Sequence, residues 1–167
     1  METFKIIEGF ETYSVSDLGN VKNNKTGRIK NVNANENGYI QVSVSKNKKK
    51  YKQMVHVFVA SAFIENLENK SFVDHIDNCK TNNNITNLRW ATSVQNCQNR
   101  GIRNDNSSGV VCVSWEKKVN KWRSRITIDG IHVHLGLFTN IEDAKQARIT
   151  RANEAFGVFT NACEKII

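Results

Sequence analysis

Residues 71–100 constrain the fold of this chain more than any other segment, because strand, turn and helix signals follow one another closely there. Residues 71–76 form a short apolar run that predicts a strand. Residues 77–84 are dense in turn-forming side chains and predict a loop. Residues 87–91 predict a second strand, and a capping box after it predicts a helix that begins at Ser93. The segment therefore predicts a β-hairpin closed by a helix.

The polar residues of this segment have the chemistry of metal-assisted hydrolysis. Asp74 and His75 end the first strand, and Asn87 begins the second. Asn96 falls in the second turn of the helix. A carboxylate and an amide can ligate one hard cation while a neutral imidazole activates a water, as phosphodiester cleavage requires. Because neighbours on a regular strand point to opposite faces, we expect the strand to end or bulge at Asp74 and His75. We also expect Asp74 to face the metal ion and His75 to face the attacking water, open to solvent.

The same residues carry a resemblance to a known family. The segment resembles the HNH homing endonucleases of the ββα-metal fold, above all phage intron-encoded nicking enzymes, through residues 73–77, 82–83, 87–90 and 94–96. The resemblance implies that His75 is the general base and that Asn87 holds the loop that orients it. It also implies that Asp74 and Asn96 bind a divalent metal ion.

Two features depart from the pattern of the resembled family. Asn96 stands where many relatives carry a histidine, and an amide oxygen suits magnesium better than it suits transition metals. We therefore expect one Mg²⁺ or Mn²⁺ ion in each active site, and not zinc. Asn78 and Cys79 replace a pair that usually contains glycine, which changes the shape of the loop. The alternative interpretation is that these polar residues are no more than a surface pair and a turn.

Composition and charge point to a polyanionic partner. The chain of 167 residues has a net charge of +8 and a pI near 9.4, which favours double-stranded DNA as the partner. No long apolar run or signal-like N-terminus indicates a membrane or export, and no obligatory protein partner is evident. The four cysteines form no CxxC pair and no zinc-finger spacing, which indicates reduced thiols. We therefore expect a cytoplasmic protein, which acts in the host cytoplasm if a phage or virus encodes it.

Residues 1–51 predict a β-rich module. Short apolar runs between glycine and asparagine turns predict four strands, at residues 4–7, 13–15, 19–22 and 39–44. The pattern of residues 9–21 resembles a small nuclease-associated module that commonly precedes HNH domains. A basic run at the end of the module is suited either to tracking a DNA backbone or to keeping a hairpin tip soluble, and it comprises Lys46, Lys48, Lys49, Lys50 and Lys52.

Residues 52–106 form the predicted catalytic domain. Residues 55–64 are apolar almost all round, which predicts a buried helix between the β-rich module and the active site. His56 lies at the start of this helix, and we interpret it as a packing residue. Arg100, four residues after Asn96, is expected on the same face of the later helix, where it either contacts phosphate or is simply solvated.

Residues 107–167 predict a third domain that follows a polar linker. Three strands are predicted, with Asp129 and Gly130 as a tight hairpin turn, at residues 110–115, 121–128 and 131–135. A capping box at residues 139–142 opens a helix that Gly157 ends. Three strands on one helix resemble the plant ethylene-response-factor (APETALA-type) DNA-binding domain, through residues 109, 113–115, 121–123, 134–136 and 138.

Alternation along the second of these strands separates the two faces of the sheet. Trp122, Ser124 and Ile126 are predicted on the helix side, and the residues between them on the open face. An open face that carries arginines can read guanine in a major groove, and an ordinary solvated face is the alternative. The predicted DNA contacts of this domain are Trp115, Lys117, Arg123, Arg125, His132 and His134.

The predicted fold class is α+β, with a ββα-metal HNH core between a β-rich module and a three-stranded sheet plus helix. Lys and Arg outnumber Asp and Glu by nine to five in residues 1–51, six to five in residues 52–106 and nine to six in residues 107–167. This distribution suits flanks that hold phosphates around a nearly neutral catalytic segment.

The predicted function is that of a site-specific homing endonuclease, a mobile-element enzyme of phage or viral type that nicks one strand of DNA with a divalent metal. Two rivals stay open. One is a non-catalytic sequence-specific DNA-binding protein, such as a repressor or transcription factor. The other is a nuclease without sequence preference.

Overall fold

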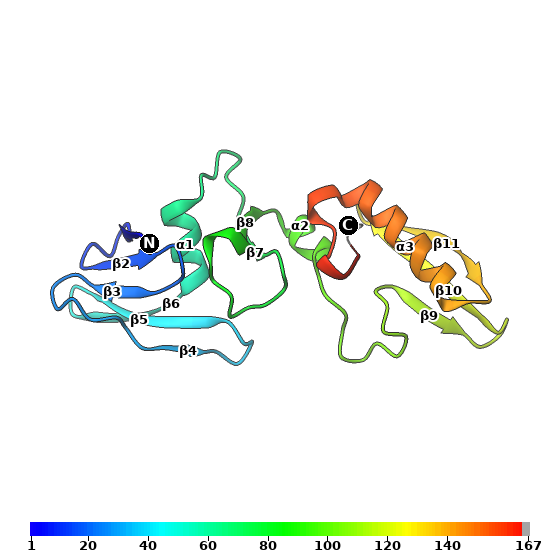
Figure 1. Cartoon of the computed structure of the whole chain (residues 1–167), viewed down its shortest axis with the longest axis horizontal. Coiled ribbons are helices and arrows are strands. Elements are labelled where there is room, and N and C mark those ends of the chain that lie inside the picture. The colour runs from blue at the N-terminus through cyan, green and yellow to red at the C-terminus, as the bar shows by residue number, and fades with distance from the viewer. Residues whose placement is uncertain (165–167) are drawn as a thin grey trace. The chain divides into compact units, whose positions relative to one another are not determined.

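The computed structural model describes residues 1–164, and the chain forms two compact units that divide between Ser93 and Val94. Figure 1 shows the first unit in blue to green and the second in green to red. Both units mix helices and strands, as the α+β prediction requires. No helix among residues 1–164 is long and apolar enough to cross a bilayer.

The first unit contains three small antiparallel sheets and one helix. The first sheet has the order β1-β2-β3, with strands Phe4–Ile6, Tyr13–Ser16 and Val21–Asn23. The second has the order β4-β5-β6, with strands Val32–Ala34, Ile40–Lys46 and Lys49–Met54. Helix α1 follows at Val55–Phe63. The third sheet pairs β7 at Phe72–His75 with β8 at Leu88–Ala91. A short 3₁₀ helix at Ile85–Asn87 directly precedes β8.

One hydrophobic core joins strands from all three sheets to helix α1. Strands β2, β3 and β5 contribute valines that alternate with polar residues, and α1 and β8 pack on them, so that the buried set comprises Ile7, Tyr13, Val15, Val21, Val42, Val44, Val55, Phe58, Val59 and Leu88. Residues on both sides of the predicted boundary between residues 51 and 52 therefore contribute to the same core. The boundary does not divide two cores.

Two strands of this unit were not predicted from the sequence. Strand β4 has three exposed residues and no apolar pattern. Strand β6 is lysine-rich and forms because it pairs with β5 through a two-residue turn, in which Asn47 and Lys48 both have positive φ. The remaining predicted strands and the buried helix after residue 54 are confirmed, with small changes at their ends.

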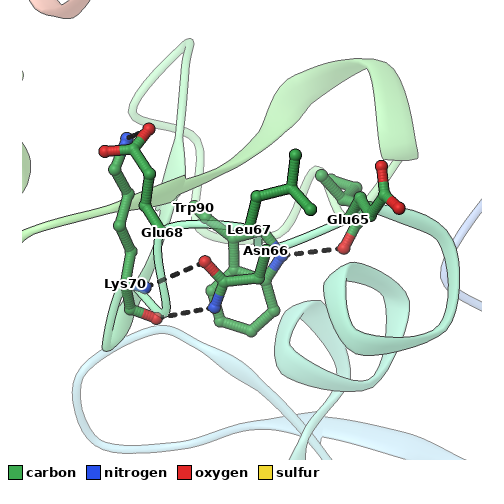
Figure 2. A pocket seen from close by; sticks show the side chains of 7 residues that line it. Glu65, Asn66, Leu67, Glu68, Lys70 and Trp90 are labelled. Atoms are coloured by element: carbon green, nitrogen blue, oxygen red, sulfur yellow. Dashed lines mark hydrogen bonds and ion pairs between the residues drawn. The ribbon is translucent and has the colours of Figure 1, made fainter.

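The connection from α1 to β7 is closed on itself by Asn66 and is fastened to the hairpin by Trp90 (Figure 2). The Asn66 amide accepts from the Lys70 backbone N–H at 2.9 Å and donates to the Lys70 carbonyl at 2.9 Å. Trp90 on β8 donates from Nε1 to the carbonyl of Ile64 at 2.9 Å. A surface pocket of about 240 Å³ lies beside this connection, and none of the predicted catalytic residues lines it.

The second unit is a three-stranded antiparallel sheet covered by a helix. The sheet has the order β11-β10-β9, and its strands are β9 at Val113–Glu116, β10 at Lys121–Ile128 and β11 at Ile131–Phe138. Helix α3 at Ile141–Phe156 packs on β10 and β11. The core between them comprises Ile126, Ala152 and Phe156, with Ile128, Val133, Leu135 and Ala155 packed against it.

Turn and cap chemistry explain the boundaries of these elements. Asp129 and Gly130 both have positive φ, which is the geometry of the predicted tight hairpin. The N-cap of α3 is Asn140, one residue later than the capping box predicted, and its side chain accepts from the Glu142 N–H at 3.0 Å. Gly157 ends the helix with a φ of 52°.

Helix α2 at Ser93–Gln98 begins where the sequence predicted but ends early. Asn99 is fully buried, and its carbonyl accepts from the Asn161 amide at 2.6 Å, which holds the chain in place after the helix. The expectation that Arg100 shares a helix face with Asn96 is therefore wrong, because Arg100 lies beyond the helix and is exposed.

Candidate active site

The β7–β8 hairpin places Asp74 opposite Arg89 and His75 opposite Leu88. Arg89 donates from Nε to Asp74 Oδ2 at 2.8 Å, and its Nη2 forms an ion pair with the same oxygen at 2.7 Å. Asp74 is only 5% exposed, so this pair compensates a buried charge. Strand β7 ends at His75, as expected. Neighbouring side chains on a regular strand point to opposite faces, so Asp74 and His75 could not both face one site if the strand continued.

His75 is enclosed by the side chains of three other segments. Its ring lies 4.8 Å from the ring of His56 and 5.9 Å from that of Tyr39, and its Nε2 lies 3.1 Å from Asn83 Oδ1. The residue is 5% exposed, so the expectation that solvent reaches it freely is wrong for the chain alone. Burial lowers the pKa of His75, against opposing contributions from the Asn83 hydrogen bond and the nearby carboxylates. The imidazole is therefore held in its neutral form, as a general base requires.

His56 is packed directly behind His75, at the start of α1. It is 7% exposed, and its Nδ1 is buried without a hydrogen-bond partner among residues 1–164. Burial, followed by the repulsion that His75 would exert if both rings were protonated, lowers the pKa of His56 to about 4. A neutral packing histidine, as the sequence indicated, fits this environment.

Asn87 fastens the loop between the two strands. Its Oδ1 accepts from the Asp77 N–H at 3.0 Å, and its Nδ2 donates to Asp77 Oδ1 at 2.8 Å and to the Asn82 carbonyl at 2.9 Å. Asp77 also accepts from the Cys79 N–H at 2.7 Å and from the Asn82 amide at 2.7 Å. Although burial acts in the opposite direction, these hydrogen bonds lower the pKa of Asp77. The Asp77 carboxylate thus accepts most of the hydrogen bonds that fix the conformation of the loop.

Sequence reasoning missed Asp77 and Asn83 as functional candidates, because residues 77–84 were interpreted as a turn. The density of side chains that hydrogen-bond to nearby backbone was the available signal. The contact from Asn83 to His75 depends on how the loop folds back, and no sequence period indicates it.

The predicted metal ligands belong to different units of the structure. Asp74 lies in the first unit, and Asn96 is half-buried on α2 in the second. Among residues 1–164, no group of three or more His, Cys, Asp and Glu side chains is placed to hold a metal ion. A carboxylate with an amide is the donor set that the residues offer, and it suits a hard cation that keeps several waters. The shared ion of Asp74 and Asn96 stays a prediction.

The basic run lies at the tip of the β5–β6 hairpin in the first unit. Every member is exposed, and the turn residue Lys48 has a φ of 63°. The predicted contacts of this tip are Lys46, Lys48, Lys49 and Lys50.

The open face of the sheet in the second unit is basic, as predicted. Arg123 forms an ion pair with Glu116 at 3.0 Å, whereas Arg125 is exposed and has no ion pair among the described residues. Thr127 Oγ1 and His132 Nδ1 lie 2.9 Å apart, and His134 faces Arg125 across the strands.

Trp115 does not lie on this basic face. It pairs with Trp122 across the strands and stacks edge-on against it at 5.1 Å. Directly opposed residues point to the same side of a sheet, so Trp115 shares the face of Trp122, while Lys117 is exposed in the turn after β9.

The site combines a β-hairpin whose first strand ends in a buried Asp-His pair, a loop held by hydrogen bonds from Asn87, and a helix after the second strand. These features together define an HNH-type nuclease site. The comparison of families agrees with this class. The NUMOD4 motif matches residues 2–45, and the HNH endonuclease family matches residues 53–98.

The DNA endonuclease I-HmuI of Bacillus phage SP01 is 34% identical over 134 residues, which cover 77% of this chain and 74% of that protein. A solved structure of the HNH homing endonuclease I-HmuI matches with a TM-score of 0.56 at 30% identity, covering 93% of this chain and 83% of that chain. The chain therefore belongs to the HNH endonuclease family.

Uncharacterized HNH endonucleases of Acanthamoeba polyphaga mimivirus are also similar. One of them is 38% identical over 90 residues, which cover 54% of this chain and 27% of the viral protein. The match covers about a quarter of the length of two of these viral proteins and 56% of the length of a third.

Proposed function

We propose that this chain is a site-specific homing endonuclease that hydrolyses DNA phosphodiester bonds and nicks one strand. The observation that carries the proposal is the β7–β8 hairpin, which presents Asp74 and a neutral His75 side by side while Asn87 clasps the loop between the strands. Membership of the HNH endonuclease family and similarity to a homing endonuclease support the same activity.

In the proposed mechanism, His75 takes a proton from the attacking water, and the resulting hydroxide attacks phosphorus in line with the leaving oxygen. Asp74 and Asn96 would hold Mg²⁺ or Mn²⁺, which when bound would neutralise charge on the phosphate and on the leaving 3′ oxygen. Arg89 contacts Asp74 Oδ2 through two guanidinium nitrogens, so this ion pair keeps the carboxylate in place. Because His75 is 5% exposed, the mechanism requires a side chain over its ring, such as that of Tyr39, to move when DNA binds.

Two basic surfaces would bind the DNA. The lysine tip of β5–β6 is suited to phosphates, which give affinity without sequence preference. The open face of β9–β11 carries Arg123 and Arg125, which are suited to guanine edges in a major groove, as in the ethylene-response-factor (APETALA-type) domains that this unit resembles. Of the two arginines, Arg125 has no ion pair among the described residues and is the better candidate for a base contact.

The test is cleavage of supercoiled plasmid DNA by the full chain, with Mg²⁺ or Mn²⁺ and with chelator. The proposal predicts nicked circles that appear only with metal, and discrete cut positions when the strands are mapped on a random DNA library. Binding that prefers one DNA sequence, without any cleavage, would identify a sequence-specific binding protein. A smear of products would identify a nuclease without sequence preference.

A further inference from the structure

The contact between Asn83 and His75 bears on which ring nitrogen of His75 carries the proton. Asn83 is 6% exposed, and its Oδ1 lies 3.1 Å from His75 Nε2. The Asn83 Nδ2 is directed to the Thr81 carbonyl at 3.4 Å, which leaves the amide oxygen facing the imidazole. Because an amide oxygen only accepts, the neutral ring must carry its hydrogen on Nε2. The lone pair is then on Nδ1.

The N-terminal part of the chain holds Asn83 in this position. Residues 16–20 form a turn in which the fully buried Ser16 accepts, through Oγ, from two backbone N–H groups of the turn at 2.9 and 3.3 Å. Gly19 in this turn has a φ of +90°, and a Cβ there would lie 2.8 Å from Asn83 Cβ. The Asp17 carbonyl accepts from the Ile85 N–H at 2.8 Å. The turn therefore supports the loop on both sides of residue 84.

We propose that Asn83 is a positioning residue, which fixes the His75 tautomer so that Nδ1 is the nitrogen that takes the proton from water. We further propose that the turn around Gly19 keeps Asn83 in contact with the ring. The matched NUMOD4 segment would then be a working part of the catalytic unit, in addition to any role in DNA binding. This inference rests on the proposed role of His75 as the general base.

The direct test is the imidazole ¹⁵N spectrum of the full chain with ¹⁵N-labelled histidine, without metal or DNA. The four histidines give few signals, and the signal that disappears in His75→Gln belongs to His75. In the wild type we expect the hydrogen on Nε2 and none on Nδ1. Asn83→Ala should give a mixture of tautomers, and Asn83→Asp, whose carboxylate also accepts, should restore the single tautomer.

Kinetics supply a second readout from the same variants. Asn83→Ala should lower kcat about 10- to 100-fold with little change in KM for DNA, as is typical when a partner that orients a functional histidine is removed. Asn83→Asp should recover most of that loss. Asn84→Asp is the matched control, since it adds the same charge one residue away and keeps its acceptor for the Thr86 N–H.

Gly19→Ala tests the support from the turn, and Gly27→Ala is its control. Both glycines have positive φ, so both substitutions carry backbone strain, but a Cβ at Gly27 meets nothing within 4 Å. We expect Gly19→Ala alone to mix the tautomers and lower kcat. If Gly19→Ala does not fold, the Asn83 variants still decide the question of the tautomer.

Hydrogen on Nδ1 in the wild type, or an unchanged tautomer and kcat in Asn83→Ala, would overturn the inference while leaving the proposed nuclease intact. A single Nε2–H tautomer in a chain that cleaves no DNA with either metal would instead overturn the proposed function, and the catalytic meaning of the tautomer with it.

Discussion

Arg89 and Asp74 face each other across β7 and β8, and two guanidinium nitrogens contact one carboxylate oxygen at 2.7 and 2.8 Å. The side chains are 15% and 6% exposed. Removal of the arginine leaves a buried carboxylate without this partner, so Arg89→Met should lower the free energy of unfolding by about 3–5 kcal/mol. Urea denaturation measures this change.

The double variant with Asp74→Asn should recover much of the lost stability, because the uncompensated charge is then gone. The control is Arg103→Met, whose ion pair with Asp105 is largely exposed on both sides and should give no measurable change. Equal effects at the two arginines would contradict the interpretation of a compensated buried charge.

The buried His56 should make stability depend on pH. Its pKa is about 4 in the folded protein and near 6.5 when unfolded, so the unfolded state binds more protons between these values. The stabilisation is complete above pH 6.5 and declines as pH falls toward 4, by up to about 3 kcal/mol. Thermal or urea unfolding across this range should show the decline.

His56→Phe should flatten the decline, although His75, whose pKa is also lowered, retains a share of it. His134→Ala removes an exposed histidine and should leave the curve unchanged. A curve that His56→Phe does not alter would mean that this imidazole is not buried in the neutral form.

Asn87 should govern the order of the loop more than it governs global stability. Asn87→Ala removes three hydrogen bonds, each worth about 1 kcal/mol, and leaves Asp77 without two of its contacts. Amide hydrogen exchange should accelerate in residues 77–82, and cleavage should fall while DNA affinity is kept. Unchanged hydrogen exchange in this loop would show that the Asn87 hydrogen bonds are not needed to order it.

Two kinds of DNA contact should separate in binding experiments. Lys48→Ala should weaken binding to all sequences alike and reduce the slope of log K against log salt by about 1. Arg125→Ala should cost about 1–3 kcal/mol on the preferred sequence and little on others. If both variants behaved alike on preferred and random DNA, the sheet of β9–β11 would not read bases.

The sequence was sufficient to predict the elements whose signals are local. The β7–β8 hairpin, the start of α2 at Ser93, the Asp129-Gly130 turn and α3 each depend on turn residues, caps or periodicity that act within a few positions. Strand β6 escaped prediction because its lysines show no apolar alternation, and only pairing with β5 makes it a strand.

The arrangement around His75 depends instead on contacts that are distant in sequence. Tyr39, His56 and Asn83 enclose the ring from three segments, so neither its burial nor its tautomer can be inferred from spacing. In the same way, α2 ends just before Asn99, whose carbonyl accepts from Asn161, 62 positions away in the sequence.

The most direct test of the central claim compares DNA cleavage and DNA binding by His75→Ala and the wild type on one target. The account predicts that the variant loses metal-dependent nicking while its affinity for the target stays within a few-fold of the wild type. Undiminished nicking, or loss of cleavage and binding in equal measure, would contradict the assignment of His75 as the general base.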